Sequence, residues 1–254
     1  MKLTFARRLR AAAPLLAGMA ALVISAQACA QPGNGTNAQR GAAAASAAGL
    51  PPLDSVLARA SRSREHGSQY ARVTLYEVSD FQCPFCRMFF SNTYAKFDSA
   101  YVKAGKVRVV FINFPLPMHN QAFAASKAAT CAGAQGKFWE MHDRLFQRQG
   151  EWQNQPDAHE RFARYAADLG VNAAQFRDCV ENDRTSPLLV NDLMQAMGAQ
   201  VNSTPTLILN RGEKVLNGAV SYEELSAAVD ALLAAAPAAG AQPAPPAPGT
   251  PARP

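Results

Sequence analysis

The stretch Asp80-Phe81-Gln82-Cys83-Pro84-Phe85-Cys86 follows an apolar, strand-like run at residues 73–78 and precedes a helix-like segment at residues 84–104. A Cys-x-x-Cys set at a helix start is typical of a redox centre, because unpaired backbone N–H groups and the helix dipole favour thiolate over thiol. Cys83 is therefore expected to be the nucleophile, and Cys86 to close a disulfide with it. Pro84 suits the first helical turn, since its φ is already helical and it has no N–H to leave unpaired.

Half of a zinc site is the alternative interpretation of these two cysteines, and it requires two more ligands at matching spacing. No second Cys-x-x-Cys or His-x-x-x-His follows in the sequence. The histidines have no metal-binding spacing either, and they are His66, His119, His142 and His159. We therefore expect no metal and no cofactor.

The first 30 residues have the pattern of an export signal. Lys2, Arg7, Arg8 and Arg10 come without an acidic residue, and a 14-residue apolar run at residues 11–24 is followed by small residues. That run is shorter than the roughly 20 residues that a membrane-spanning helix needs. Without the signal, the formal charge of +6 falls to near neutrality, so the charge gives no reason to expect a nucleic acid partner.

The cleavage point is ambiguous, because residues 26–28 and 28–30 both fit a small-x-small pattern. Cleavage before Cys29 would leave it as the lipidated first residue of a lipoprotein, although Ala26 and Gln27 fit a lipobox poorly. Otherwise Cys29 leaves with the signal. Either way, the mature chain keeps an even number of cysteines, which predicts disulfides in an exported protein. They are Cys83, Cys86, Cys131 and Cys179.

The chain divides into four parts by composition. The export signal at residues 1–30 precedes an Ala/Gly-rich linker at residues 31–69, whose last part favours a short helix. Residues 70–232 are long enough for one domain with a hydrophobic core, and residues 233–254 form an Ala/Pro-rich tail expected to be disordered.

Within the core, strand patterns occur at residues 72–78, 107–113, 206–209 and 214–216, and a mostly helical insertion covers about residues 116–199. Helix starts with a capping pattern are predicted at Asp157, with Glu160, and at Ser221, with Glu224. The first two strands should pair in parallel through a crossover helix, and the last two should form a hairpin. The predicted class is α/β, with a mixed sheet and helices on both faces.

Four features together resemble the thioredoxin superfamily, and within it the DsbA-like thiol:disulfide oxidoreductases of the bacterial envelope. They are the motif at residues 80–86, Glu77 six residues before its first cysteine, the run Gln135-Gly136-Lys137-Phe138-Trp139-Glu140-Met141-His142-Asp143, and Ser203-Thr204-Pro205-Thr206 at the start of the third strand. The resemblance implies a thioredoxin-like sheet with an inserted helical domain.

The resemblance also implies roles for individual residues. The Thr204–Pro205 bond would be cis beside the cysteine pair, where these two residues, with Pro84 and Phe85, would bind an extended client. A trans proline opening an edge strand is the alternative. Glu77 would relay a proton to Cys86, whereas an outward-facing carboxylate in an alternating strand is its ordinary interpretation. Cys83 would be the exposed thiol and Cys86 the shielded one.

The activity implied is donation of the Cys83–Cys86 disulfide to reduced exported proteins by a periplasmic monomer. A quinone-coupled inner-membrane protein would reoxidise it. Phe85 departs from the strongest oxidases of the family, which carry His there, so the direction of electron flow is less firmly implied than the reaction class. A reductase or isomerase on the same fold is the alternative, followed by a soft-metal binding protein.

With Cys83 and Cys86 as the redox pair, Cys131 and Cys179 are expected to form a structural disulfide; two buried free thiols are the alternative. His119 could lie near the active site, although structural capping of a helix is the favoured interpretation. The aromatic residues of the segment 138–146 have helical spacing and are expected to be core.

Overall fold

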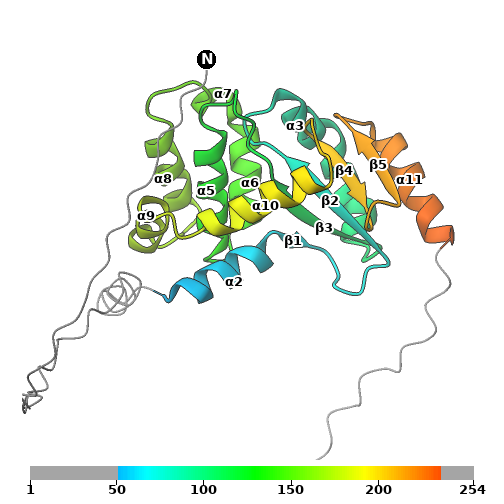
Figure 1. Cartoon of the computed structure of the whole chain (residues 1–254), viewed down its shortest axis with the longest axis horizontal. Helices are drawn as coiled ribbons and strands as arrows, with labels where there is room; N and C mark the ends of the chain where they lie inside the picture. The colour runs from blue at the N-terminus through cyan, green and yellow to red at the C-terminus, as the bar shows by residue number, and fades with distance from the viewer. Residues whose placement is uncertain (1–50, 236–254) are drawn as a thin grey trace, which may run out of the picture.

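The structure, a computed structural model, describes residues 51–235, which contain a five-stranded mixed sheet with helices on both faces (Figure 1). Its order is β1-β3-β2-β4-β5; β2 and β3 are parallel and the other neighbours antiparallel. This confirms the predicted α/β class with a mixed sheet. The strands are β1 (Glu65–His66), β2 (Val73–Ser79), β3 (Val107–Asn113), β4 (Thr206–Leu209) and β5 (Lys214–Asn217).

The predicted export signal, Cys29 and most of the C-terminal tail lie outside the described residues. The domain boundaries proposed from composition stay predictions.

The crossover between β2 and β3 is one continuous helical course. It consists of α3 (Pro84–Phe89), η1 (Phe90–Tyr94), α4 (Ala95–Phe97) and η2 (Asp98–Val102). The course ends before Gly105, whose φ of +71° suits a residue without a side chain. The sequence predicts this helix but not the two π-helical segments η1 and η2 within it.

The helical insertion follows β3 and returns to the sheet at β4. Its first helix, α5, packs against α6, α8 and α9 around a core of large apolar side chains that includes Phe138, Trp152 and Phe162. The insertion consists of α5 (Ala122–Gly133), α6 (Phe138–Gln147), α7 (Gln149–Trp152), α8 (Ala158–Asp168), α9 (Ala173–Glu181) and α10 (Ser186–Gly198).

Different helices pack on the two faces of the sheet. In Figure 1, α10 crosses in front of β2 and β3, where it packs on Val78, Val110 and Ile112. The crossover course and α11 (Tyr222–Ala235) cover the opposite face, which carries Leu75. Because side chains alternate along a strand, Glu77 lies on the same face as Leu75, toward the crossover course.

Three local details differ from or add to the sequence expectations. The helix α2 (Leu53–Ser63) leads into β1, a two-residue edge strand that the sequence does not reveal. Asp157 is the N-cap residue of α8, as predicted, but its side chain makes no capping hydrogen bond; its carboxylate accepts one from the Arg161 guanidinium instead. Ser221 does cap α11, since its hydroxyl accepts a bond from the Glu224 N–H at 3.1 Å.

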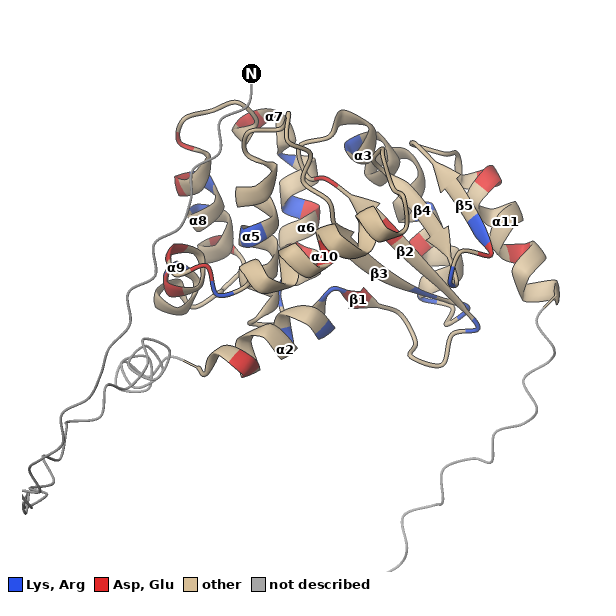
Figure 2. Ribbon diagram, viewed as in Figure 1, with Lys and Arg blue, Asp and Glu red and all other residues tan. Residues whose placement is uncertain are grey.

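Acidic and basic residues are mixed along elements such as α6 and α8 (Figure 2). Within residues 51–235, no helix is long and apolar enough to cross a membrane.

Candidate active site

The sequence places the two cysteines at the junction between a buried strand and a helix. Cys83 is the N-cap of α3 with extended backbone angles, φ −68° and ψ 126°, and Pro84 occupies the first turn. The Cys83 carbonyl accepts a hydrogen bond from the Arg87 N–H at 3.1 Å. One helical turn therefore positions Cys86 back toward Cys83, as the spacing predicts.

The two sulfur atoms have different neighbours. Cys83 Sγ lies 3.4 Å from the carbonyl oxygen of Thr204. Cys86 Sγ accepts a hydrogen bond from the backbone N–H of Asp80 at 3.5 Å. Both thiols are free and buried, at 4% exposure for Cys83 and 0% for Cys86. The expectation of an exposed Cys83 is therefore wrong, because the Thr204 segment lies against its sulfur.

The pKa values of the two thiols move in opposite directions. A hydrogen bond from the Cys86 thiol is the largest contribution that lowers the pKa of Cys83, to about 6 from an ordinary 9.0. Burial raises the pKa of Cys86 well above that ordinary value. At neutral pH the pair therefore holds a thiolate on Cys83 and a proton on Cys86, an arrangement suited to nucleophilic attack through Cys83.

The Thr204–Pro205 peptide bond is cis and leads directly into β4. Thr204 is buried beside Cys83, and the Pro205 carbonyl accepts a hydrogen bond from Gly218 at 2.8 Å. Pro84 and Phe85 lie on the exposed side of α3, where the Phe85 side chain is 57% exposed. The structure thus brings Thr204 to the cysteine pair and leaves an apolar side chain in solvent next to it.

Glu77 lies in the middle of β2 and is buried, at 1% exposure. The alternative of an outward-facing carboxylate therefore does not describe it. Its Oε2 atom has no hydrogen-bond partner among residues 51–235. Burial raises the pKa of this carboxyl, which favours its protonated form.

Asp80 organises the loop before α3, and sequence reasoning did not single it out. Its carboxylate accepts hydrogen bonds from the Gln82 N–H at 2.7 Å and from the Leu116 N–H at 2.8 Å. His119 Nδ1 lies 2.7 Å from the same carboxylate. His119 therefore reaches the motif through Asp80 and does not cap α5, whose N-cap is Gln121. The position of Asp80 within the motif was the available signal.

Gln149 at the start of α7 was also missed. Its buried side-chain amide donates to the carbonyl of Phe81 at 2.7 Å and to that of Cys83 at 3.1 Å. The insertion is thereby fixed to the active-site loop. No local pattern around Gln149 could reveal this contact, because the partners are more than 60 residues away in sequence.

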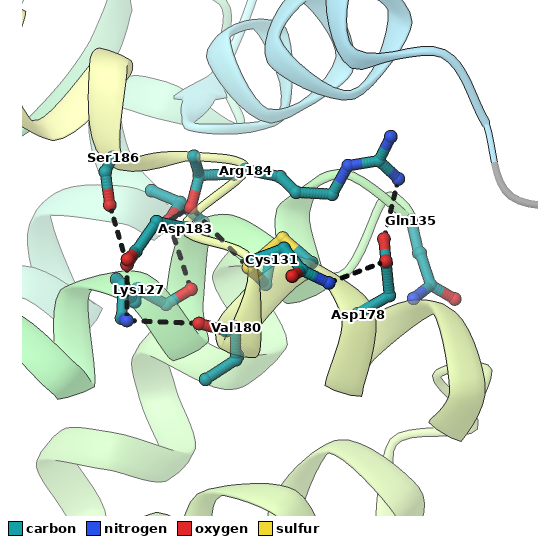
Figure 3. The surroundings of a disulfide bond; sticks show 12 residues. Lys127, Cys131, Gln135, Asp178, Val180, Asp183, Arg184 and Ser186 are labelled. Atoms are coloured by element: carbon teal, nitrogen blue, oxygen red, sulfur yellow. Dashed lines mark hydrogen bonds and ion pairs between the residues drawn. A yellow bond between two sulfur atoms is a disulfide. The ribbon is translucent and has the colours of Figure 1, made fainter. Parts of the chain in front are cut away.

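A disulfide joins Cys131 of α5 to Cys179 of α9, with the Cα atoms 5.8 Å apart. Figure 3 shows polar contacts on both sides of it. Lys127 donates to the Val180 carbonyl at 3.1 Å, and Arg184 donates to Asp178 at 2.7 Å. This cross-link lies in the insertion, apart from the Cys83–Cys86 pair.

In the part of the chain that the structure describes, no group of three or more His, Cys, Asp or Glu side chains is placed to hold a metal ion.

Comparison with known proteins finds a matching family model and several relatives of this chain. A family model described as thioredoxin matches residues 60–231. A protein named Na(+)/H(+) antiporter NhaA 3 from Salinispora tropica is 32% identical over 176 residues, covering 69% of this chain and 25% of that protein. The chain thus spans about a quarter of the first curated relatives that it matches. Disulfide bond formation protein D of Bacillus subtilis is 25% identical over 180 residues, covering 65% of this chain and 74% of that protein.

Solved structures share the fold at low sequence identity. Wolbachia pipientis α-DsbA1 superposes with a TM-score of 0.61 at 19% identity, covering 68% of this chain and 91% of that one. Oxidised BdbD from Bacillus subtilis has a TM-score of 0.58 at 21% identity, covering 67% of this chain and 92% of that one.

Proposed function

The chain belongs to the thioredoxin family, with the DsbA-like architecture predicted from its motifs, and from that premise we propose that it is an envelope thiol:disulfide oxidoreductase. It donates the Cys83–Cys86 disulfide to reduced exported proteins. The observation that carries this proposal is the asymmetry of the pair: the pKa of Cys83 is lowered to about 6 while that of Cys86 is raised.

The reaction consists of two displacements. A client thiolate attacks Cys83 Sγ, a client–Cys83 disulfide forms, the Cys83–Cys86 bond breaks, and Cys86 leaves and takes up a proton. A second client thiolate then attacks the client sulfur, and Cys83 leaves as a thiolate. The client loses two electrons and gains a disulfide, and the enzyme is reduced.

The ease with which Cys83 leaves as a thiolate favours one direction of exchange, the transfer of the disulfide to the client. A sulfur with a low pKa leaves readily, so Cys83 releases the oxidised client more easily than an ordinary thiol would. A pKa of about 6 lies between about 7 for thioredoxin and about 3.5 for DsbA. It supports a disulfide donor that is milder than DsbA, in keeping with Phe85 in the place of a cationic residue.

The client is bound by backbone rather than by sequence-specific pockets. Thr204 and Pro205 present an extended segment beside Cys83, and a client strand pairing with it would bring its own thiol to the sulfur. Pro84 and the exposed ring of Phe85 add apolar contact area on the other side. Glu77 supplies the proton that Cys86 takes up on leaving.

The proposed partners follow from the proposed reaction and from the predicted export signal. The clients are reduced exported proteins, and a quinone-coupled inner-membrane protein reoxidises the pair. The protein works in the periplasm as a monomer. Lipidation of Cys29 would hold it at a membrane surface.

A peptide with two cysteines tests the proposal. Oxidised wild-type protein should convert the dithiol peptide to its disulfide in equal molar amount, and Cys83→Ala should not. Cys86→Ala carrying a thionitrobenzoate group on Cys83 should form a lasting covalent adduct with a single-cysteine peptide, because no second thiol resolves it. Mass spectrometry reads both products. If the wild-type protein leaves the dithiol peptide unoxidised, disulfide donation is wrong.

A disulfide reductase is the second candidate, and Phe85 is the observation that favours it. This exposed ring offers neither charge nor a hydrogen-bond donor to the Cys83 thiolate. Reduction of a peptide disulfide by the reduced enzyme, faster than the reverse reaction at equal concentrations, would establish that direction.

A further inference from the structure

A group of buried polar side chains lies beneath the active-site helix, and the exchange reaction described above uses only one of them. Among the described residues, Glu77 Oε2, His142 Nε2 and Tyr94 Oη are buried and lack a hydrogen-bond partner. Unpaired polar atoms are costly in a protein interior, and they occur close together here within a wall of aromatic rings.

The sheet register and the ring contacts place His142 over Glu77. Glu77 of β2 pairs with Phe111 of β3, so their side chains point to the same face. The imidazole of His142, from α6, has its centroid 5.2 Å from that of Phe111 and 6.0 Å from that of Tyr94. A protonated His142 lowers the pKa of Glu77, against the larger effect of burial, so the two groups are close enough to interact.

The other side of the imidazole reaches the surface. His142 Nδ1 lies 2.8 Å from Asp143 Oδ1, and the Asp143 side chain is 48% exposed. A carboxylate accepts, so Nδ1 carries the hydrogen and donates it. Nε2 then presents its lone pair to the core, where burial raises the pKa of the Glu77 carboxyl.

A purely structural role explains this arrangement poorly. The imidazole is packed by the rings of Phe81, Phe90 and Phe146, where a phenylalanine would fill the space without an unpaired nitrogen. His142 instead joins the buried carboxyl to a surface carboxylate.

We propose that His142, oriented by Asp143, is a positioning residue that carries protons between Glu77 and solvent, so that Cys86 can gain and lose its proton without opening the core. The inference rests on the proposed exchange activity. Because Glu77 Oε2 and His142 Nε2 make no direct hydrogen bond, the relay requires one water molecule between them.

The proton balance of one cycle is as follows. When the Cys83–Cys86 bond breaks, the Glu77 carboxyl gives its proton to the Cys86 thiolate. His142 then returns a proton to Glu77 through Nε2 while Nδ1 takes one from solvent beside Asp143. On reoxidation by oxidised glutathione, Cys86 loses its proton by the reverse route as the disulfide forms and glutathione leaves reduced.

The titratable groups facing the imidazole are Glu77 from β2, Tyr94 from η1 and Asp143 from α6; β3 and the loop before α3 contribute only phenylalanines. Loss of the relay should therefore change the pH profile of steady-state turnover. Without His142, the titration of Glu77 alone should govern that profile.

Single-turnover and steady-state rates separate the relay from the exchange itself. A first reduction of the oxidised enzyme uses the proton that Glu77 already holds, whereas repeated turnover requires its replacement. His142→Gln should slow steady-state peptide oxidation with oxidised glutathione by tenfold or more at pH 7 and change the first reduction less than twofold. His159→Gln, an exposed histidine on α8, is the matched control.

Asp143→Asn keeps the test valid if His142→Gln folds poorly, because this surface position tolerates change. It should slow steady-state turnover about threefold or more with an unaltered unfolding midpoint. In a Glu77→Gln background neither substitution should have a further effect. Unchanged steady-state rates, or an equal loss of both rates in the two variants, would overturn the relay. Failure of the wild-type enzyme in the first reduction would instead overturn the proposed exchange activity.

Discussion

Thr204 and Cys83 are 121 residues apart in sequence, yet the Thr204 carbonyl lies 3.4 Å from the Cys83 sulfur. At the residue scale, the reactivity of this thiol comes from three sources: its place at the start of α3, the hydrogen bond from Cys86, and the segment that covers it. The first is readable from Cys-x-x-Cys spacing. The other two depend on tertiary structure, which is why the sequence predicts the exposure of Cys83 wrongly.

Phe85→His tests the local electrostatics at Cys83. The side chain at this position is exposed, so a histidine fits without repacking, and its N–H and positive charge should stabilise the thiolate. We expect the pKa of Cys83 to fall below 6 and the potential of the pair to rise by about 30 mV or more, a tenfold change in equilibrium constant. Thiolate absorbance measures the pKa of Cys83, and equilibration with glutathione measures the potential of the pair.

Met88→His, one turn further along α3, is the matched control and should change both quantities less. An unchanged thiolate pKa in Phe85→His would show that position 85 does not influence the sulfur.

The lowered pKa of Cys83 also fixes how the redox potential depends on pH. The thiolate stabilises the reduced folded protein in full above the ordinary pKa of 9.0; this stabilisation decreases as the pH falls below 9.0 and is lost once the pH passes through about 6. The potential should therefore fall by about 59 mV per pH unit below this point and by about 30 mV per unit above it. Measuring the potential by equilibration with glutathione at a series of pH values from 5 to 8 gives these slopes. A single slope of about 59 mV throughout would contradict the lowered pKa.

Glu77→Leu separates stability from activity at one buried position. Burial raises the pKa of Glu77, so the folded state disfavours its ionised form, and stability is lost as the pH rises above the ordinary value of 4.5. The substitution should add about 1–3 kcal/mol at pH 8, remove that pH dependence, and slow peptide oxidation at least about tenfold.

Urea denaturation of the oxidised protein from pH 4 to 8 measures this effect. Glu140→Gln, on the exposed part of α6, is the control and should leave the pH dependence in place. A Glu77→Leu protein that is less stable at pH 8 would show that the carboxyl is paired in solution.

At the scale of secondary-structure elements, α5 and α9 are joined both by packing and by the Cys131–Cys179 disulfide. The cysteines are 48 residues apart in sequence. For a closed loop of this length, the chain-entropy model gives about 4 kcal/mol of stabilisation.

The double substitution Cys131→Ala/Cys179→Ala should therefore lower the free energy of unfolding by about 3–4 kcal/mol. Since the cross-link lies apart from Cys83, the potential of the catalytic pair should move by less than about 10 mV, well under a tenfold change in equilibrium constant. Urea denaturation measures the free energy of unfolding, and equilibration with glutathione measures the potential of the pair. A large change in potential would mean that the insertion controls the active site through this bond.

The elements themselves were predictable where one residue pattern dominates. Residues 107–113 are rich in β-branched side chains and almost continuously apolar, which predicts a strand, and they form β3 with those bounds. The two-residue strand β1 has no pattern of its own, because its pairing with β3 gives it its conformation. The helix start at Asp157 was predicted correctly, but its carboxylate bonds to Arg161, one turn along, and not to a backbone N–H of the first turn.

At the scale of the whole molecule, long-range polar contacts fix parts that the sequence shows only as separate segments. Buried Arg64, next to β1, forms a 2.5 Å ion pair with Asp192 of α10, and Asp192 also accepts from the Asn113 N–H at 3.0 Å. Gln149 fixes the insertion to the active-site loop in the same manner. The motifs predicted the family and the mixed sheet, but single polar residues in unremarkable contexts give no sign of such partners.

The reduction potential of the Cys83–Cys86 pair tests the central claim most directly. The mature protein is equilibrated with glutathione at pH 7, with Cys131→Ala/Cys179→Ala as the control for thiol counting. A disulfide donor should have a potential more positive than about −200 mV, above the glutathione pool. A potential near the value of about −270 mV found for thioredoxin would contradict disulfide donation and make the protein a reductase.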